Sequence, residues 1–313
     1  MLDATEDPRT EGAAAEGPWR RVTCWRVHLG AHKTATTHLQ EALRPRRAAL
    51  RRAGVDYLPM PGVRAAGLQD LRRETEGAGR AARRRALTDR LRGLRRGGAT
   101  VALSEENLIG SSLGLLGPEP YPTCGPMIRW LALLGEGAEL RLFLAIRSFD
   151  ALLPSAYAEA SRRHAVPGGF ERVRARAAAE PPSWAGLIDR LRRAAPKAEL
   201  RVWRYEDYAA HAREAATLFL GLDPGPLDMD RRPQSTATPS AAAVAEAERL
   251  PTGLSTAERE ARTREIYARL PATGPETKFN PFTAPERARL RDRYARDLEE
   301  IDRAHPGVLV RWD

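Results

Sequence analysis

The chain has only two cysteines and three lysines among its 313 residues, and it contains no long apolar run. Cys24 and Cys124 are too few and too far apart for a disulfide framework or a zinc site, so we expect both to pack in the core. No stretch approaches the ~20 apolar residues of a membrane span, so we expect no membrane segment. Residues 1–20 are polar and acidic, whereas a secretion signal has a basic start and an apolar core. We therefore expect a disordered leader over 1–20 and a cytoplasmic protein.

The remaining composition is that of a globular protein, with 42% hydrophobic and 29% charged residues. A chain of this length can bury one large core, and we expect a single domain over residues 21–313. Within it, residues 222–313 read as helices with proline-rich joints.

Positive charge dominates, with a net charge of +10, and its densest part is the ten arginines between Arg72 and Arg96. No aromatic residue interrupts that run, and single-strand binders stack bases on aromatic side chains. No recognisable groove-reading module is present either. We interpret the run as a solvated helix face and expect no nucleic-acid partner.

A metal site is also not expected from the histidines. His28 and His32 are four residues apart, but the pattern places His28 on a strand and His32 in a loop. The two side chains then lack the helical spacing of metalloprotease histidine pairs.

Apolar strands separated by amphipathic helices predict an α/β fold, with a central parallel sheet between helical layers. The expected strands are Val27–Leu29, Val55–Leu58, Ala99–Ser104, Leu140–Arg147 and Leu200–Tyr205. The expected helices include 127–134, 149–164, 184–194, 206–220, 240–250, 256–270 and 284–304.

The segment from Trp25 to Gln40 has the outline of a phosphate-binding loop. An apolar strand enters a turn at Gly30, and Thr36 can open a helix whose free N–H groups face an anion. Lys33 adds a point charge, and it is one of only three lysines in the chain. The usual nucleotide loop places its lysine directly after a second glycine, so ATP is not the first ligand to suspect.

This loop resembles that of the sulfotransferases that use 3'-phosphoadenosine 5'-phosphosulfate (PAPS), which reads roughly P/H-K-[ST]-G-T-T. The match fails only at Ala35, where the family has glycine. The resemblance implies a three-layer αβα fold of the P-loop type, and a 5'-phosphosulfate site that needs no metal. Its residues would be His32, Lys33, Thr34, Ala35, Thr36 and Thr37.

Two further elements resemble the same family, in the same order along the chain. Arg147 ends a strand and Ser155 follows eight residues later, the separation at which the family holds the 3'-phosphate. Both groups are donors, and a guanidinium can bind two phosphate oxygens. Tyr205 heads a strand-ending Tyr-Glu-Asp and would lie near the adenine. A basic turn at Arg231 and Arg232 is the candidate for closing the 3'-phosphate site.

The transfer reaction needs a base for the acceptor hydroxyl. Glu106 is our first candidate, because a glutamate that follows a buried strand beside the loop can be partly desolvated, which raises its pKa. Glu105, His32 and His38 remain alternatives, and an acid at Glu106 could equally favour a helix N-terminus.

We therefore expect a PAPS-dependent sulfotransferase acting on a hydroxyl or amine of a small molecule, such as a glycoside or secondary metabolite. The alternatives are a P-loop kinase or other phosphotransferase, and a degenerate sulfotransferase-like binding protein, which Ala35 favours. A kinase is disfavoured, because the sequence has no evident strand-ending aspartate for magnesium.

The acceptor pocket is expected between the 118–126 loop, the 165–182 segment and the C-terminal helices, whose arginines hint at an acidic acceptor. The oligomeric state is open.

Overall fold

The computed structural model describes residues 22–65, 80–93, 97–135, 137–228 and 238–312. The expected leader, and Arg231 and Arg232, lie outside these residues. No helix of the described part is long and apolar enough to cross a membrane.

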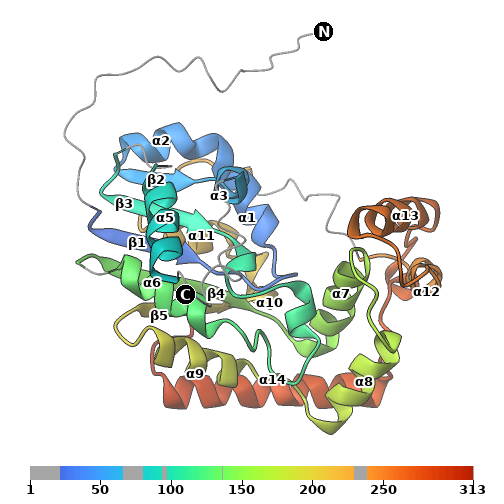
Figure 1. Cartoon of the computed structure of the whole chain (residues 1–313). Coiled ribbons are helices and arrows are strands. Elements are labelled where there is room, and N and C mark those ends of the chain that lie inside the picture. The colour runs from blue at the N-terminus through green and yellow to red at the C-terminus, as the bar shows by residue number, and fades with distance from the viewer. Residues whose placement is uncertain (1–21, 66–79, 94–96, 136, 229–237, 313) are drawn as a thin grey trace.

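A five-stranded parallel sheet forms the centre, as the alternating strands and helices predicted (Figure 1). Its strands are β1 (Cys24–His28), β2 (Val55–Leu58), β3 (Thr100–Ser104), β4 (Glu139–Ile146) and β5 (Glu199–Arg204). They lie in the order β2-β3-β1-β4-β5, so β1 has β3 on one side and β4 on the other. His28, at the end of β1, pairs with Ser104 of β3 and with Phe143 of β4.

Alternate residues of each strand face opposite layers of helices, because successive side chains of a strand point to opposite faces. Val27, Leu103 and Leu142 belong to the larger core cluster. Ala102 and Phe143 belong to the smaller one. The α/β architecture therefore rests on a sheet that is buried on both faces.

The larger cluster is covered by α6 (Gly125–Leu134), α7 (Phe149–Ser161) and α9 (Trp184–Ala194). The smaller one is covered by α1 (Thr36–Leu43), α2 (Arg47–Arg52) and α11 (Ala212–Leu220). Both cysteines are buried, Cys24 on β1 and Cys124 before α6, in agreement with packing roles.

The other helices lie around this frame. They are α3 (Met60–Ala65), α5 (Arg80–Gly93), α8 (Gly169–Ala179), α10 (Tyr205–Tyr208), α12 (Ala241–Glu248), α13 (Thr256–Arg269) and α14 (Ala284–Ala304). Figure 1 shows α14 running alongside α9, with α12 and α13 to one side of the sheet. Short 3-10 turns are η1 (Arg44–Arg46), η3 (Glu106–Leu108), η4 (Ser112–Leu115) and η6 (Pro275–Thr277).

Two sequence predictions need correction here. The helix expected over 206–220 is two helices, because α10 ends at Tyr208 and α11 begins at Ala212. Helix α8 was not predicted, although it lies inside the segment expected to line the acceptor pocket. Its N-cap is Gly168 at φ 78, so the helix begins from a left-handed residue rather than from a recognisable Ser, Thr, Asp or Asn cap.

The strand that carries the loop is tied to helix α11 by one buried arginine. Arg26 donates from Nε to the carbonyl of Phe219 at 2.7 Å, and from Nη2 to that of Leu218 at 2.7 Å. These carbonyls belong to the last turn of α11, where helices have unpaired acceptors and favour positive charge.

We expect Arg26→Met to lower the free energy of unfolding by about 2–4 kcal/mol, since it leaves two buried carbonyls without their charged donor. Arg201→Met is the matched control, because Arg201 is 40% exposed and pairs with Glu199. It should cost below about 1 kcal/mol. Urea denaturation measures both, and equal losses would contradict this role of Arg26.

Candidate functional site

The loop after β1 turns tightly through three residues of positive φ. Gly30 has φ 52, Lys33 has φ 67 and Ala35 has φ 64. A Cβ built on Gly30 would lie 2.4 Å from Oγ1 of Thr36, so this close approach requires glycine. The loop thus folds back on the start of α1, as its resemblance to an anion-binding loop predicts.

Thr34 stabilises this turn with its side chain. Its buried hydroxyl donates to the carbonyl of Ala31 at 2.6 Å and accepts from the N–H of Ala31 at 3.2 Å. The Thr36 hydroxyl is also buried and lies 3.4 Å from the same carbonyl. Both hydroxyls therefore shape the loop in this conformation, while Thr37 is only partly buried.

Helix α1 begins directly after this turn with no side-chain cap. Its N-cap is Ala35, whose methyl group cannot accept a hydrogen bond. The first N–H groups of a helix have no intrahelical partner, and the helix dipole adds partial positive charge there. The start of α1 can therefore bind an anion next to Lys33.

Ala35 holds a conformation that favours glycine. A left-handed alanine costs roughly 1–2 kcal/mol relative to ordinary backbone. The sequence left open whether φ is positive at this position, and the structure shows that it is. The loop keeps the left-handed turn and bears this strain.

Arg147, at the end of β4, lies directly against the loop. Its Nη1 donates to the carbonyl of Lys33 at 3.0 Å, and its guanidinium carbon lies 4.4 Å from the centre of the Tyr205 ring. Tyr205 follows β5, the neighbour of β4 in the sheet. Three residues that the sequence singled out separately thus lie side by side.

Glu159 on α7 is a site residue that the sequence analysis missed. Its Oε2 lies 3.8 Å from Nζ of Lys33 and 3.6 Å from Nη1 of Arg162. Burial lowers the pKa of Lys33, and the charge of Glu159 opposes that shift. Ser155 is buried four residues before Glu159, so the two share one face of α7. This spacing from Ser155 is the signal that could have identified Glu159.

Two neighbouring glutamates follow β3 and differ in their contacts. Glu105 is fully buried and accepts from Arg64 at 2.7 and 3.0 Å, and from the backbone and side chain of Asn107 at 3.0 and 2.6 Å. Glu105 caps η3, and both of its carboxylate oxygens have hydrogen-bond partners from Arg64 or Asn107. Glu106 is 15% exposed and accepts from Gln40 at 3.3 Å and Arg64 at 3.2 Å. Burial, followed by the charge of Glu105, raises the pKa of Glu106.

His32 belongs to a hydrogen-bond chain that settles its tautomer. Asn107 donates its amide group to the Glu105 carboxylate, so its oxygen faces Nε2 of His32, at 3.4 Å. Nε2 therefore carries the proton, and Nδ1 accepts from the Tyr121 hydroxyl at 2.9 Å. That hydroxyl accepts in turn from the His32 N–H at 2.9 Å. Burial lowers the pKa of His32 to about 4, so the ring is neutral near pH 7.

His38 faces the other side of the loop, with Nδ1 2.9 Å from the Tyr208 hydroxyl. Both histidines that the sequence offered as bases therefore already have partners. Among the described residues, no group of three or more His, Cys, Asp or Glu side chains is arranged to hold a metal ion.

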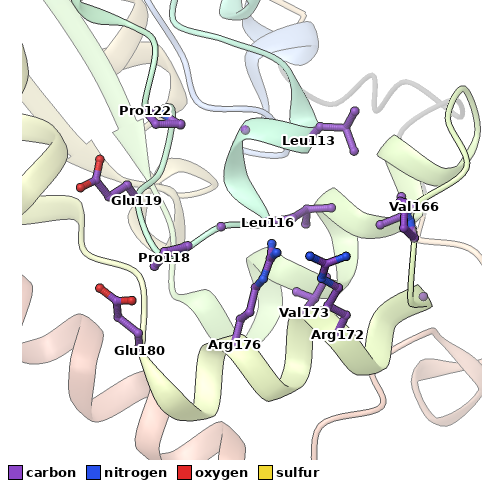
Figure 2. A pocket seen from close by; sticks show the side chains of 14 residues that line it. Leu113, Leu116, Pro118, Glu119, Pro122, Val166, Arg172, Val173, Arg176 and Glu180 are labelled. Atoms are coloured by element: carbon purple, nitrogen blue, oxygen red, sulfur yellow. The ribbon is translucent and has the colours of Figure 1, made fainter.

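A cavity of about 500 Å³ lies between the segment around η4 and helix α8 (Figure 2). Its lining comes from residues 113–122 and 166–180, which overlap two of the three segments expected to form an acceptor pocket, 118–126 and 165–182. The C-terminal helices contribute none of the residues that line this cavity, and their part in an acceptor pocket stays a prediction. Helix α14 packs on α7 and α9.

No protein-family model matches the chain, and no curated protein matches it. Among solved structures, it is similar to a sulfotransferase from Alicyclobacillus acidocaldarius, with a TM-score of 0.42 and 16% identity. The alignment covers 80% of this chain and 94% of that one. A likeness at this level does not assign the chain to a family.

We expect Ala35→Gly to stabilise the protein by about 0.5–1 kcal/mol, because glycine removes the left-handed strain at a small cost in unfolded-chain entropy. Ala53→Gly is the matched control, since Ala53 is exposed and has φ −82. That change should destabilise by about 0.5 kcal/mol. Chemical denaturation distinguishes the two, and a destabilised Ala35→Gly would show that the strain argument is wrong.

Proposed function

We propose that the protein is a PAPS-dependent sulfotransferase that transfers the sulfuryl group to a hydroxyl or amine of a small acceptor, such as a glycoside or secondary metabolite. The observation that carries this proposal is the hydrogen bond from Arg147 to the loop carbonyl of Lys33. It unites the two residues that the resemblance assigned to opposite ends of one nucleotide. Tyr205, the residue proposed for the adenine, stacks on the same guanidinium.

The chemistry of this donor set suits a nucleotide with phosphate at both ends. Lys33 and the N–H groups at the start of α1 would hold the 5'-phosphosulfate, with help from Thr36 and Thr37. Arg147 and Ser155 would hold the 3'-phosphate, which ATP lacks. When bound, PAPS supplies a sulfuryl group that is attached to a phosphate leaving group. The resemblance also implies that this transfer needs no metal.

Within that frame, Lys33 would place its charge where negative charge grows on the leaving oxygen. Its ammonium lies 3.8 Å from Oε2 of Glu159, so this role would require Lys33 to turn from Glu159 toward the leaving oxygen. The low-dielectric surroundings that lower the pKa of Lys33 also strengthen its attraction to an anion.

Glu106 is our proposed base for the acceptor proton. It retains some exposure, whereas Glu105 is fully buried and engaged by Arg64 and Asn107. The raised pKa of Glu106 moves its basicity toward that of an efficient proton acceptor near neutral pH. His32 would have to break its bond to Tyr121 or to Asn107 before it could serve.

Calorimetric titration tests the cofactor. We expect tight, metal-independent binding of 3'-phosphoadenosine 5'-phosphate, and weak binding of ATP and ADP with or without magnesium. Lys33→Ala and Arg147→Ala should each weaken the affinity for 3'-phosphoadenosine 5'-phosphate roughly tenfold to a hundredfold, since each removes a charge-assisted contact.

The matched control is Lys197→Ala, because Lys197 is exposed and precedes β5, at the opposite end of the strands from the loop. It should leave affinity unchanged. A preference for ATP with magnesium would favour the phosphotransferase instead, and unaltered binding by both site variants would remove this site assignment.

Glu106→Gln should keep its affinity for 3'-phosphoadenosine 5'-phosphate and lose sulfuryl transfer, because the amide cannot take the acceptor proton. Transfer from radiolabelled PAPS to a panel of phenols and glycosides measures this. Glu105→Gln is the comparison, and it should instead reduce stability, since it weakens the buried contacts to Arg64 and Asn107.

Unimpaired transfer by Glu106→Gln would assign the base to another residue. Nucleotide binding by the wild type without transfer to any acceptor of the panel would favour the binding-protein alternative, for which Ala35 is the structural reason.

A further inference from the structure

The cavity beside α8 combines an apolar wall with two arginines that project into it (Figure 2). Leu113, Leu116, Val166 and Val173 supply apolar surface, and Arg172 and Arg176 supply positive charge. Glu119 and Glu180 also line the cavity, and Glu119 lies 3.7 Å from Nη1 of Arg190. Its volume of about 500 Å³ falls within the range of small-molecule sites.

The arginines of α8 divide according to the face they occupy. Arg172 and Arg176 are four residues apart, so they lie on one face of the helix, toward the cavity. Arg174 lies on another face, where its Nε is 2.7 Å from Glu286 and its Nη1 is 3.5 Å from Glu171. Within the described part of the chain, neither of these two guanidinium groups has an ion-pair or hydrogen-bond partner.

This division indicates a binding role for the two cavity arginines. A guanidinium presents a planar fork of donors that matches the oxygens of a carboxylate or sulfonate. Two forks one helical turn apart can approach one oxyanion together. Leu116 and Val173 adjoin them in Figure 2 and suit the apolar body to which such a group would be attached.

Tyr121 joins the cavity wall to the loop after β1. The Tyr121 N–H donates to the carbonyl of Gly114 in the cavity wall at 2.8 Å, and its hydroxyl accepts from the loop N–H of His32 at 2.9 Å. Tyr121 has φ 53, which is unusual for a bulky residue, and its ring packs against Gly110 and Gly114. Tyr121 therefore links a wall of the cavity to the loop after β1.

We propose that this cavity binds the acceptor, and that the acceptor is an apolar organic anion whose oxyanion lies between Arg172 and Arg176. The acceptor role rests on the proposed function, since it takes Lys33 and its loop as the sulfuryl donor site. The anion site itself follows from the cavity and its unpaired arginines.

Direct binding tests the proposal without turnover. The probes are hydroxyaryl carboxylates of graded length, the corresponding sulfonates, and the neutral carboxamides, each titrated calorimetrically into the full chain. We expect at least one anionic series to bind about tenfold or more tightly than its amides, because each amide lacks the charge-assisted contacts. Carboxylates and sulfonates are titrated separately, so a comparison of their affinities identifies the preferred oxyanion.

The double variant Arg172→Gln/Arg176→Gln should lose this preference for anions. Arg174→Gln is the matched control on the same helix and should keep it. Both cavity arginines are exposed, so the double variant should unfold at the wild-type temperature, which a melting curve checks. Equal affinity of acids and amides for the wild type, or a preference that survives in the double variant, would overturn the anion site.

Titration of the double variant with 3'-phosphoadenosine 5'-phosphate separates the two proposals. Unchanged nucleotide binding together with a lost preference for anions supports the cavity as a distinct acceptor site. If the wild type fails to bind the nucleotide but keeps its arginine-dependent preference for anions, the proposed function is wrong and the anion site stands.

Discussion

The hydrogen bond from Arg147 to the carbonyl of Lys33 is the contact around which the site is organised. It joins the ends of β1 and β4 across 114 residues of sequence. The loop reaches this position through left-handed backbone at Gly30, Lys33 and Ala35. The same guanidinium stacks on Tyr205 after β5, so one cation connects three strand ends. Burial of the loop follows from this arrangement, and with it the lowered pKa of Lys33.

Strand order explains why these residues meet. Because β1 lies between β3 and β4, the loop after β1 has the glutamates that follow β3 on one side and Arg147 on the other. In open parallel sheets, ligands bind outside the carboxyl ends of strands at such a reversal of strand order. The two sides differ in chemistry. Glu105 and Glu106 supply carboxylates, whereas Arg147 and Tyr205 supply a cation and an aromatic ring, and Lys33 stands between them.

Local patterns predicted most of the fold and part of the site. The strand Val55–Leu58 and the helix Trp184–Ala194 have the predicted bounds, since apolar alternation and the Ser183 cap mark them clearly. Helix α8 was missed because it begins at a left-handed glycine and carries many arginines and alanines. Lys33, Arg147 and Tyr205 were singled out by their resemblance to family motifs; Arg147 and Tyr205 directly follow strands, and Lys33 lies in the loop after β1. Glu159 was not, since it lies three turns into a helix, where only its spacing of four residues from Ser155 marks it.

The sequence by itself determined the α/β class, the tight turn after the first strand and the residues that end each strand, because all of these depend on local spacing and residue type. Only the tertiary structure decided which strand ends are neighbours, because strand order depends on how distant segments pack. It also decided that Ala35 accepts positive φ and that Glu105 rather than Glu106 is fully engaged. Arg172 and Arg176 differ from Arg174 for the same reason: the carboxylate of Glu286 that pairs with Arg174 is 112 residues away in sequence.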